Sequence, residues 1–257
     1  MSDPVLLERR DAVALLTMNR PEVLNALNRA TLERLLERTE ELRAWARDGV
    51  RAVVVTGAGR AFVAGADIAE MRGLAPAQAL EFSRLGHRAM DALEALPVPV
   101  IAAVNGFALG GGCELACACD WIHASTQARF GQPEVGLGLI PGFGGTSRLA
   151  RRVGPGWARE LVMGGELVDA DTALAMGLVN RLHEPAALLD AALAAAAKLA
   201  GKGPRAVALA KRVLLEGADA DVRVASALEQ AAFGTVFGSQ ESAEGMDAFL
   251  AKRTPKF

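Results

Sequence analysis

Short apolar runs alternate with amphipathic segments along the amino-terminal half of the chain. The run 52–55 is apolar throughout, which is typical of a strand buried on both faces of a parallel sheet. Longer segments such as 29–47 repeat apolar residues at helical spacing. The pattern predicts strands at Val5–Leu7, Val13–Met18, Arg51–Thr56, Val98–Val104 and Trp121–Ala124, and helices at Arg29–Arg47, Pro76–Leu96 and Gly112–Cys119.

Strands and helices alternate in the first half of the chain, which predicts an α/β fold. From residue 144 onward the pattern is helical. We place a boundary near Gly201–Pro204, which divides the chain into a core, residues 1–200, and a helical region, residues 201–257. The later helices are predicted at Gly144–Val153, Pro155–Met163, Ala170–Met176, Pro185–Ala200, Pro204–Glu216, Asp219–Phe237 and Ser242–Lys252.

The run Ala-Leu-Gly-Gly-Gly-Cys-Glu at 108–114 lies where a strand gives way to a helix. Successive glycines let the chain turn tightly and let a ligand approach the backbone, and the free N–H groups of a new helix point outward there. Such a site binds an oxyanion. Glu114 lies one turn inside the helix on its apolar side, and burying a carboxylate is costly unless it is used or paired.

Two further segments have the same character. After the strand at 51–56, the small residues Ala64–Ala66 precede Asp67, which suits the N-cap of a short helix over 68–72. The segment 130–147 contains a single charged residue, Glu134. We therefore expect exposed amides from two loops and two carboxylates to face one cavity.

These segments closely resemble the enoyl-CoA hydratase/isomerase, or crotonase, superfamily. The resemblance runs from Leu15-Leu-Thr-Met-Asn-Arg-Pro21 and Leu24-Asn-Ala-Leu27 to Glu244-Gly-Met-Asp-Ala-Phe-Leu-Ala-Lys-Arg253, and so covers nearly the whole chain. It implies a spiral of ββα turns with carboxy-terminal helices that mediate assembly into a homotrimer or a dimer of trimers.

The resemblance also implies roles for four residues. In the family, the amides that correspond to Ala66 and Gly111 form an oxyanion hole for the thioester carbonyl. Hydratases carry both glutamates, here Glu114 and Glu134, whereas many sister enzymes keep only one. We expect Glu114 to hold and deprotonate water and Glu134 to protonate the α-carbon of a 2-enoyl-CoA. This chemistry needs neither a metal nor a redox cofactor, because the oxyanion hole polarises the carbonyl and the two carboxylates handle the water and the protons. Coenzyme A is part of the substrate.

The coenzyme A contacts follow from the resemblance less directly. At two positions where the family often carries a basic residue, this chain has Ala69 and Glu22. We expect the acyl tail to lie against 71–85. The remaining substrate-binding residues implied by the resemblance are Ala26, Ala64, Ala66, Asp67, Ile68, Ala69 and Gly111, with Phe249 and Lys252 reaching the ligand from a neighbouring subunit.

Several alternatives stay open at this point. They include an enoyl-CoA isomerase, another crotonase-type reaction and a non-catalytic protein that binds CoA ligands. A dinucleotide site is disfavoured because Phe62 occupies the last position of Gly-x-Gly-x-x-Gly. Cys113, Cys117 and Cys119 lack zinc spacing and suit an apolar helix, and no Gly-x-Ser-x-Gly elbow occurs. We expect His87, His123 and His183 to be surface or packing residues.

Composition limits the remaining function classes. The 257 residues are 51% hydrophobic and 23% charged, which is ordinary for a globular protein. A formal net charge of −2 leaves no basic surplus for nucleic acid or an anionic membrane. Three cysteines suggest a reducing compartment, and Met-Ser-Asp-Pro at the start shows no secretory leader. We therefore expect a cytoplasmic enzyme.

Overall fold

The apolar strands predicted from the sequence lie side by side in one sheet. The computed structural model describes residues 2–257, so Met1, the first residue of the predicted core range, lies outside it. The six-stranded sheet is parallel except for the β1–β2 pair. In spatial order it contains β1 (Val5–Arg10), β2 (Val13–Met18), β3 (Ala52–Gly57), β5 (Val100–Val104), β7 (Trp121–Ser125) and β10 (Arg181–His183).

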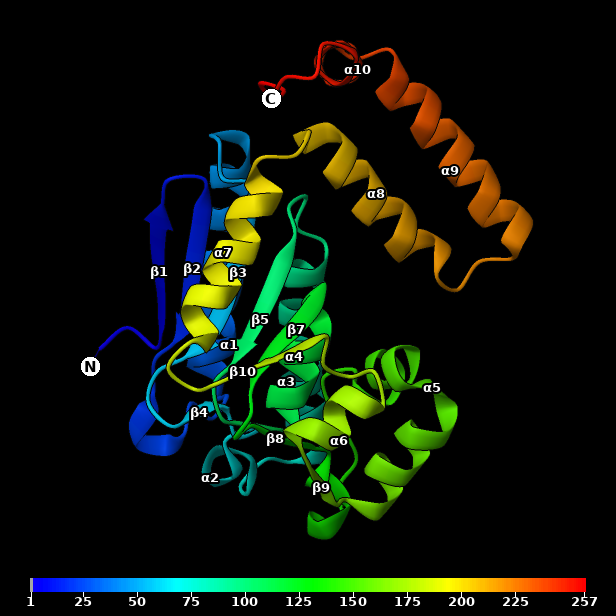
Figure 1. Cartoon of the computed structure of the whole chain (residues 1–257). Helices are drawn as coiled ribbons and strands as arrows, with labels where there is room; N and C mark the ends of the chain where they lie inside the picture. Colours follow the sequence, from blue (N-terminus) through cyan, green and yellow to red (C-terminus); the bar gives the residue numbers. More distant parts are fainter. Residues whose placement is uncertain (1) are drawn as a thin grey trace.

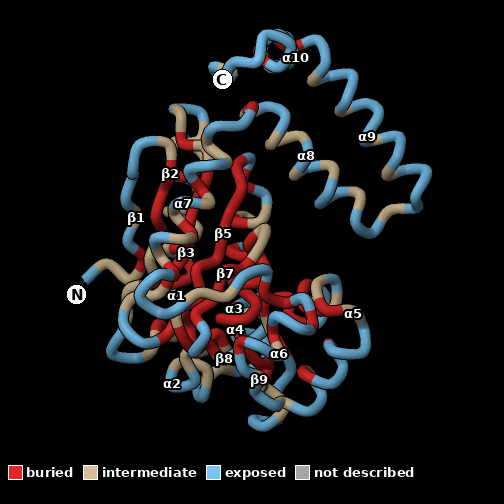
Figure 2. The backbone as a smooth tube through the Cα atoms, viewed as in Figure 1, coloured by how far each residue is buried: buried red, intermediate tan, exposed pale blue. Residues whose placement is uncertain are grey.

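Side chains of this sheet alternate between two apolar layers. On β3, Ala52 and Val54 face helix α7 (Leu188–Ala200), whereas Val53 and Val55 enter the larger core beneath. Successive residues of a strand point to opposite faces, so an unbroken apolar run supplies both layers at once. The larger core lies among α1 (Arg29–Arg47), α3 (Pro76–Glu94) and α4 (Gly111–Ala118), the part coloured as buried in Figure 2.

A second sheet lies next to the first and was not predicted from the hydrophobic pattern. Its strands have three residues each, too few to show an alternation. Each of β3, β5 and β7 is followed by a strand of this sheet and then by a helix, which gives the ββα turns that the resemblance implied (Figure 1). Its strands are β4 (Ala61–Val63), β6 (Phe107–Leu109), β8 (Arg129–Gly131) and β9 (Leu167–Asp169).

The remaining helices confirm most of the predicted segments. The two helices expected at 144–163 form α5 (Gly145–Gly164), which is kinked at Gly154, where φ is 77°. Helix α7 begins at Leu188 rather than Pro185. The other helices are η1 (Pro21–Val23), α2 (Ile68–Met71), η2 (Pro133–Leu137), α6 (Ala170–Ala175), α8 (Pro204–Gly217), α9 (Val222–Phe237) and α10 (Gln240–Leu250).

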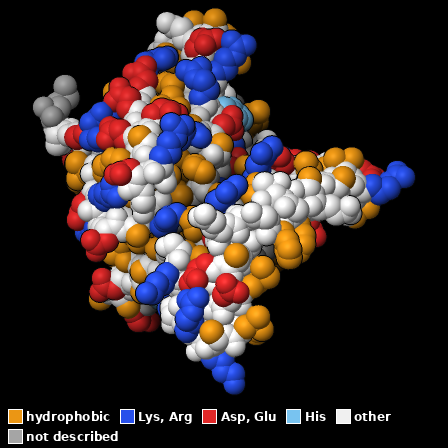
Figure 3. All heavy atoms as spheres, turned by 90° about the horizontal axis from the view of Figure 1, so that it is seen from above, with side chains coloured by type: hydrophobic (Ala, Val, Ile, Leu, Met, Phe, Trp, Pro, Cys, Tyr) orange, Lys and Arg blue, Asp and Glu red, His pale blue; other side chains and the backbone are white. Residues whose placement is uncertain are grey.

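Helices α8, α9 and α10 form an arm that leaves the sheets (Figures 1 and 2). Neither α8 nor α9 contains a buried residue. Seen from above in Figure 3, the arm projects as a ridge that carries hydrophobic side chains. The large apolar residues exposed along it are Leu214, Leu215, Val222, Val224, Phe233, Phe237, Met246, Phe249 and Leu250.

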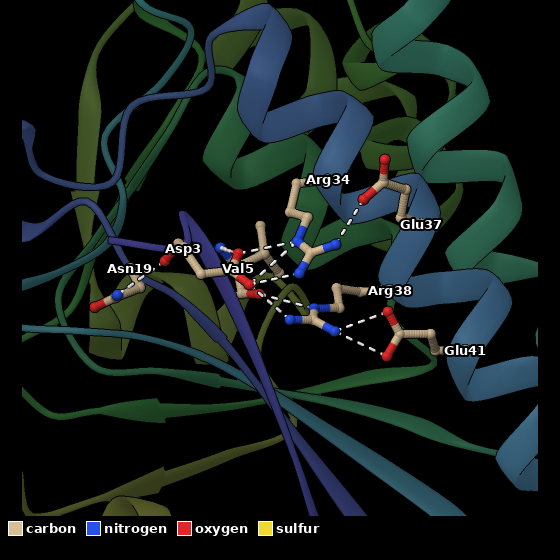
Figure 4. A network of polar contacts seen from close by, with 7 residues as sticks. All are labelled: Asp3, Val5, Asn19, Arg34, Glu37, Arg38 and Glu41. Carbon is tan, nitrogen blue, oxygen red and sulfur yellow. Dashed lines mark hydrogen bonds and ion pairs between the residues drawn. The ribbon is translucent and has the colours of Figure 1, made fainter. Parts of the chain in front are cut away.

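The amino terminus is tied to α1 by a polar network around Asp3 (Figure 4). Arg34 Nη2 and Arg38 Nη2 each donate to Asp3 Oδ2 at 2.6 Å. The amide of Val5 donates to the other carboxylate oxygen, so the network fixes the start of β1 against the helix.

Within residues 2–257, no helix has both the length and the apolar character needed to cross a bilayer.

Candidate active site

The glycine run places the start of α4 against two other elements. Gly110 has φ of 49°, and a Cβ there would lie 2.7 Å from Glu134 Oε1. A Cβ on Gly112 would lie 1.9 Å from the carbonyl oxygen of Val63, at the end of β4. Glycine is therefore required at both positions, because any larger residue would push the helix away from β4 or displace Glu134.

Glu114 is held inside α4 by backbone donors. Its side chain is buried, and the amides of Phe143 and Gly145 both donate to Oε1 at 2.7 Å. Among residues 2–257, no donor binds its other oxygen. Burial raises the pKa of Glu114 to about 7, although the two amides act to lower it. Glu114 therefore exchanges a proton near neutral pH.

Glu134 lies on η2, and its carboxylate is next to Gly110. It is half-buried, and burial raises its pKa above the usual glutamate value. With its amide nitrogen turned toward Glu134, the buried Gln132 donates to Oε1 at 3.0 Å and to Oε2 at 3.2 Å. The negative charge of Glu134 also raises the pKa of Glu114, so the two carboxyls favour holding one proton between them.

Two backbone amides face the same cavity without a protein acceptor in the described chain, those of Ala66 and Gly111. Ala66 is fixed by its neighbours, because Leu27 accepts from the Asp67 amide and donates to the Gly65 carbonyl, both at 2.9 Å. Gly111 is the first residue of α4, where the amide has no intrahelical partner. This pair is suited to bind an oxyanion.

The cavity between these groups has a volume of about 690 Å³ and a mostly apolar wall. Glu114 and Glu134 both line it. The predicted tail segment 71–85 contributes Met71, Arg72, Leu74, Ala79, Phe82 and Ser83. The rest of the wall consists of Ala64, Gly65, Ala66, Ile68, Gly110, Gly111, Pro133, Leu137, Leu139, Ile140, Pro141, Gly142 and Phe143.

Five residues assigned to substrate binding from the sequence do not line this cavity. The carbonyl of Ala26 accepts from Arg20 Nη1 at 2.5 Å. Asp67 caps α2 and pairs with the same arginine at 3.2 Å. Ala69 is exposed on α2. The other two, Phe249 and Lys252, lie at the end of the arm, where Phe249 is 82% exposed, and they do not reach the cavity of their own chain.

The cysteines and histidines occupy other parts of the fold. Cys113, Cys117 and Cys119 are free and buried, and Cys119 Sγ donates to the Leu115 carbonyl at 3.4 Å. His123 and His183 contact each other at 3.3 Å across β7 and β10, which the sequence did not predict. His87 is exposed. In the described chain, no group of three or more His, Cys, Asp or Glu residues is arranged to bind a metal ion.

Sequence reasoning missed the residues that hold the two glutamates. Gln132 stands two positions before Glu134, and its place in the same uncharged segment was the one available signal. The amides of Phe143 and Gly145 come from a glycine-rich loop 29 and 31 residues beyond Glu114, a pairing that no local pattern reveals.

The chain was compared with known families, proteins and structures. The family described as enoyl-CoA hydratase/isomerase matches residues 8–257. The chain is 47% identical to a crotonyl-CoA hydratase of Syntrophomonas wolfei over 98% of this chain and 97% of that protein. It is also 47% identical to a short-chain-enoyl-CoA hydratase of Clostridium acetobutylicum, over 97% and 95% respectively.

A solved structure shows the same fold. The enoyl-CoA hydratase of Bacillus anthracis is 37% identical, covers 99% of this chain and 98% of its own, and superposes with a TM-score of 0.95. With a match across nearly its whole length, this chain belongs to the enoyl-CoA hydratase/isomerase family.

Proposed function

We propose that the protein is an enoyl-CoA hydratase that adds water reversibly, in syn fashion, to a trans-2-enoyl-CoA and forms a 3-hydroxyacyl-CoA. The observation that carries this proposal is the placement of Glu114 and Glu134 on one apolar cavity beside two amides without acceptors. The relatives named as crotonyl-CoA and short-chain-enoyl-CoA hydratases support it.

The amides of Ala66 and Gly111 would bind the thioester carbonyl oxygen. As water adds at C3, the π electrons move toward that oxygen, and the two N–H groups stabilise the enolate that develops. Removing one such donor typically raises the barrier by roughly 3 to 4 kcal/mol. The hole provides this stabilisation from backbone dipoles, so the proposed reaction needs no metal ion or redox cofactor.

The two glutamates would divide the proton transfers. Glu114, as a carboxylate, takes a proton from water while the water oxygen bonds to C3. Glu134, as an acid, gives its proton to C2 as the enolate collapses. One proton is thus taken up and one delivered, and the raised pKa of both carboxyls suits the exchange.

The wall of the cavity favours an uncharged acyl group. Apart from the exposed Arg72, the side chains that surround the two glutamates are apolar or, as with Ser83, neutral. We keep Ala26, Ala64, Asp67, Ile68 and Ala69 as the proposed path of the coenzyme A portion. Within it, Arg20 binds the carbonyl of Ala26 and the carboxylate of Asp67.

We also propose that the chain assembles as a homotrimer or a dimer of trimers through the helical region 201–257, with residues 1–200 as the catalytic core. The exposed apolar side chains of the arm support this proposal, because a large apolar surface of a soluble chain usually marks an interface. In such an assembly, Phe249 and Lys252 would reach a neighbour's substrate. A cytoplasmic location stays a prediction from the sequence.

The activity is tested with crotonyl-CoA and purified protein in the presence of a chelator. Loss of the enoyl-thioester absorbance with formation of 3-hydroxybutyryl-CoA is expected. No turnover on any of a panel of 2-enoyl-CoA thioesters, at substantial enzyme concentration, would rule out a hydratase. Faster conversion of a 3-enoyl-CoA to its 2-enoyl isomer than hydration would instead indicate an isomerase.

A further inference from the structure

The loop 142–145, whose amides bind Glu114, packs against helix α3. Ser83 Oγ donates to the carbonyl of Gly142 at 2.6 Å. The ring of Phe143 packs edge-on against Phe82, with the centroids 5.5 Å apart. A Cβ on Gly86 would lie 2.0 Å from the Phe143 ring, so the aromatic side chain rests directly on the α3 backbone. These contacts fix the side chain of Phe143 and the peptide between Gly142 and Phe143, but they leave the next peptide, between Phe143 and Gly144, to another partner.

The buried guanidinium of Arg148 provides the missing partner. Arg148 lies on α5 and is 7% exposed. Its Nη1 donates to the carbonyl of Phe143 at 3.1 Å, while Nη2 and Nε donate to Glu94 Oε2 at 2.9 and 3.1 Å. Nη2 also pairs with Asp91. One side chain thus joins the loop to two carboxylates of α3.

The backbone of Gly144 leaves the space that the Arg148 side chain needs. Gly144 has φ of 106°, and a Cβ there would lie 2.2 Å from Arg148 Nη1. The guanidinium of Arg148 therefore lies close to the backbone of Gly144, and only glycine leaves room for it at this position. The amides of Phe143 and Gly145 on either side of Gly144 converge on one oxygen of Glu114. Holding the Phe143 carbonyl restricts the peptide between these two donors.

We propose that Arg148 is a positioning residue for Glu114. By holding the Phe143 carbonyl, it keeps both loop amides on Oε1 and leaves Oε2 for the water that is to be added. This inference rests on the proposed role of Glu114 in binding that water. Arg148 itself touches neither substrate nor the reacting atoms.

The electrostatic consequence is specific to Glu114. The titratable and charged groups around it are Glu134 on η2, Arg148 on α5 and Cys113 and Cys117 on its own helix. Hydrogen bonds from the loop amides and the positive charge of Arg148 all act to lower the pKa of Glu114. Loss of Arg148 should therefore raise that pKa and move the acid limb of the pH–rate profile upward.

The test uses Arg148→Met and Arg148→Lys, with Arg151→Met as the matched control. Arg151 lies on the same helix but pairs with Asp219 on the arm side. Each variant is assayed for crotonyl-CoA hydration from pH 5.5 to 9 and for deuterium exchange at the α-carbon of butyryl-CoA. Butyryl-CoA has no double bond, so its exchange uses the oxyanion hole and Glu134 without the added water.

For Arg148→Met we expect kcat for hydration to fall on the order of 10- to 100-fold, with KM changed by less than about threefold and the acid limb displaced to higher pH. Exchange should stay within about threefold of the wild-type rate. Lysine keeps the charge but not the planar fork, so Arg148→Lys should lie between Met and wild type. Arg151→Met should match the wild type in both assays.

Equal losses of hydration and exchange would overturn the proposal, because a merely structural role impairs both reactions. An unchanged acid limb with normal kcat in either Arg148 variant would overturn it as well, and Arg148→Lys decides the matter if Arg148→Met does not fold. Wild-type protein that shows exchange but no hydration would instead overturn the proposed function itself.

Discussion

Glu114 is 1% exposed. When it is ionised, its negative charge is stabilised by the amides of Phe143 and Gly145 and by the positive charge of Arg148. Its folded-state pKa of about 7 exceeds the value of 4.5 in an unfolded chain. A carboxyl whose pKa is raised by folding contributes stability that is fully present below the unfolded pKa. That stability is lost as the pH rises through the folded pKa.

We therefore predict that the wild-type protein loses about 3 kcal/mol of unfolding free energy from this group between pH 4.5 and 8. Glu114→Gln keeps an oxygen for both amides but carries no charge, so this decline should be absent. Urea denaturation of both proteins across that range measures the difference. The exposed Glu81→Gln is the control and should retain the wild-type slope, whereas equal slopes in wild type and Glu114→Gln would refute the prediction.

Single residues also show what the sequence can and cannot predict about a site. Glu114 and Glu134 were identified because a glycine run and an uncharged segment isolate them from ordinary surface charge. Gln132 and Arg148 were not, because their roles depend on which distant backbone they meet after folding. Asp67 was predicted both as the N-cap of a short helix and as a ligand contact; its carboxylate caps α2, as predicted, and also binds Arg20. Charge near a glycine loop does not by itself distinguish a ligand contact from a cap.

At the scale of elements, long strands and helices followed the apolar pattern closely. Helix α1 spans the predicted residues from Arg29 to Arg47, and Asn28 caps it by accepting from the Thr31 amide at 2.9 Å. The three-residue strands of the second sheet were missed because they are held by pairing with neighbours rather than by their own pattern. Two of these short strands nevertheless lead into the site, because β4 ends shortly before Ala66 and β6 ends shortly before Gly111.

The tie between β1 and α1 supports a prediction at this scale. Arg34 donates to Asp3 and holds the pKa of that carboxyl well below its usual range. Stability from such a group is present above the unfolded pKa and is lost as the pH falls. Asp3→Asn should cost about 1 to 2 kcal/mol at pH 7, a figure reduced for partial exposure, and less below pH ~4.

Urea denaturation at pH 7 and pH 3.5 measures the effect of Asp3→Asn. Glu8→Gln is the matched control, because Glu8 pairs with Arg10 on the same strand in an exposed position. That change should leave the free energy of unfolding close to the wild-type value. An Asp3→Asn cost as small as the control's would mean that the network of Figure 4 does not hold the strand.

At the scale of the whole molecule, the arm is the part that a single chain leaves incomplete. Its helices were predicted from periodicity, but the pattern did not reveal that neither α8 nor α9 contains a fully buried residue. The amphipathic pattern of a helix marks a face to be covered and does not say which molecule covers it.

We predict that the protein has no stable monomer. Covering the apolar side chains of the arm requires other copies of the chain, so the mass in solution should be a multiple of 26.8 kDa, as a trimer or hexamer. Light scattering across micromolar concentrations measures it. The mass of one chain throughout that range would contradict the assembly and would remove Phe249 and Lys252 as ligands supplied by a neighbour.

The central claim is that Glu134 handles the proton at the α-carbon and Glu114 handles the water. It is tested most directly by measuring deuterium incorporation at the α-carbon of butyryl-CoA beside hydration of crotonyl-CoA, in Glu114→Ala and Glu134→Gln. Glu134→Gln should abolish both reactions together. Glu114→Ala should lose hydration by at least the ~10² to 10⁴ that an acid–base group contributes, yet keep measurable exchange. Complete loss of exchange in Glu114→Ala, or near-normal hydration by Glu134→Gln, would contradict this division of roles.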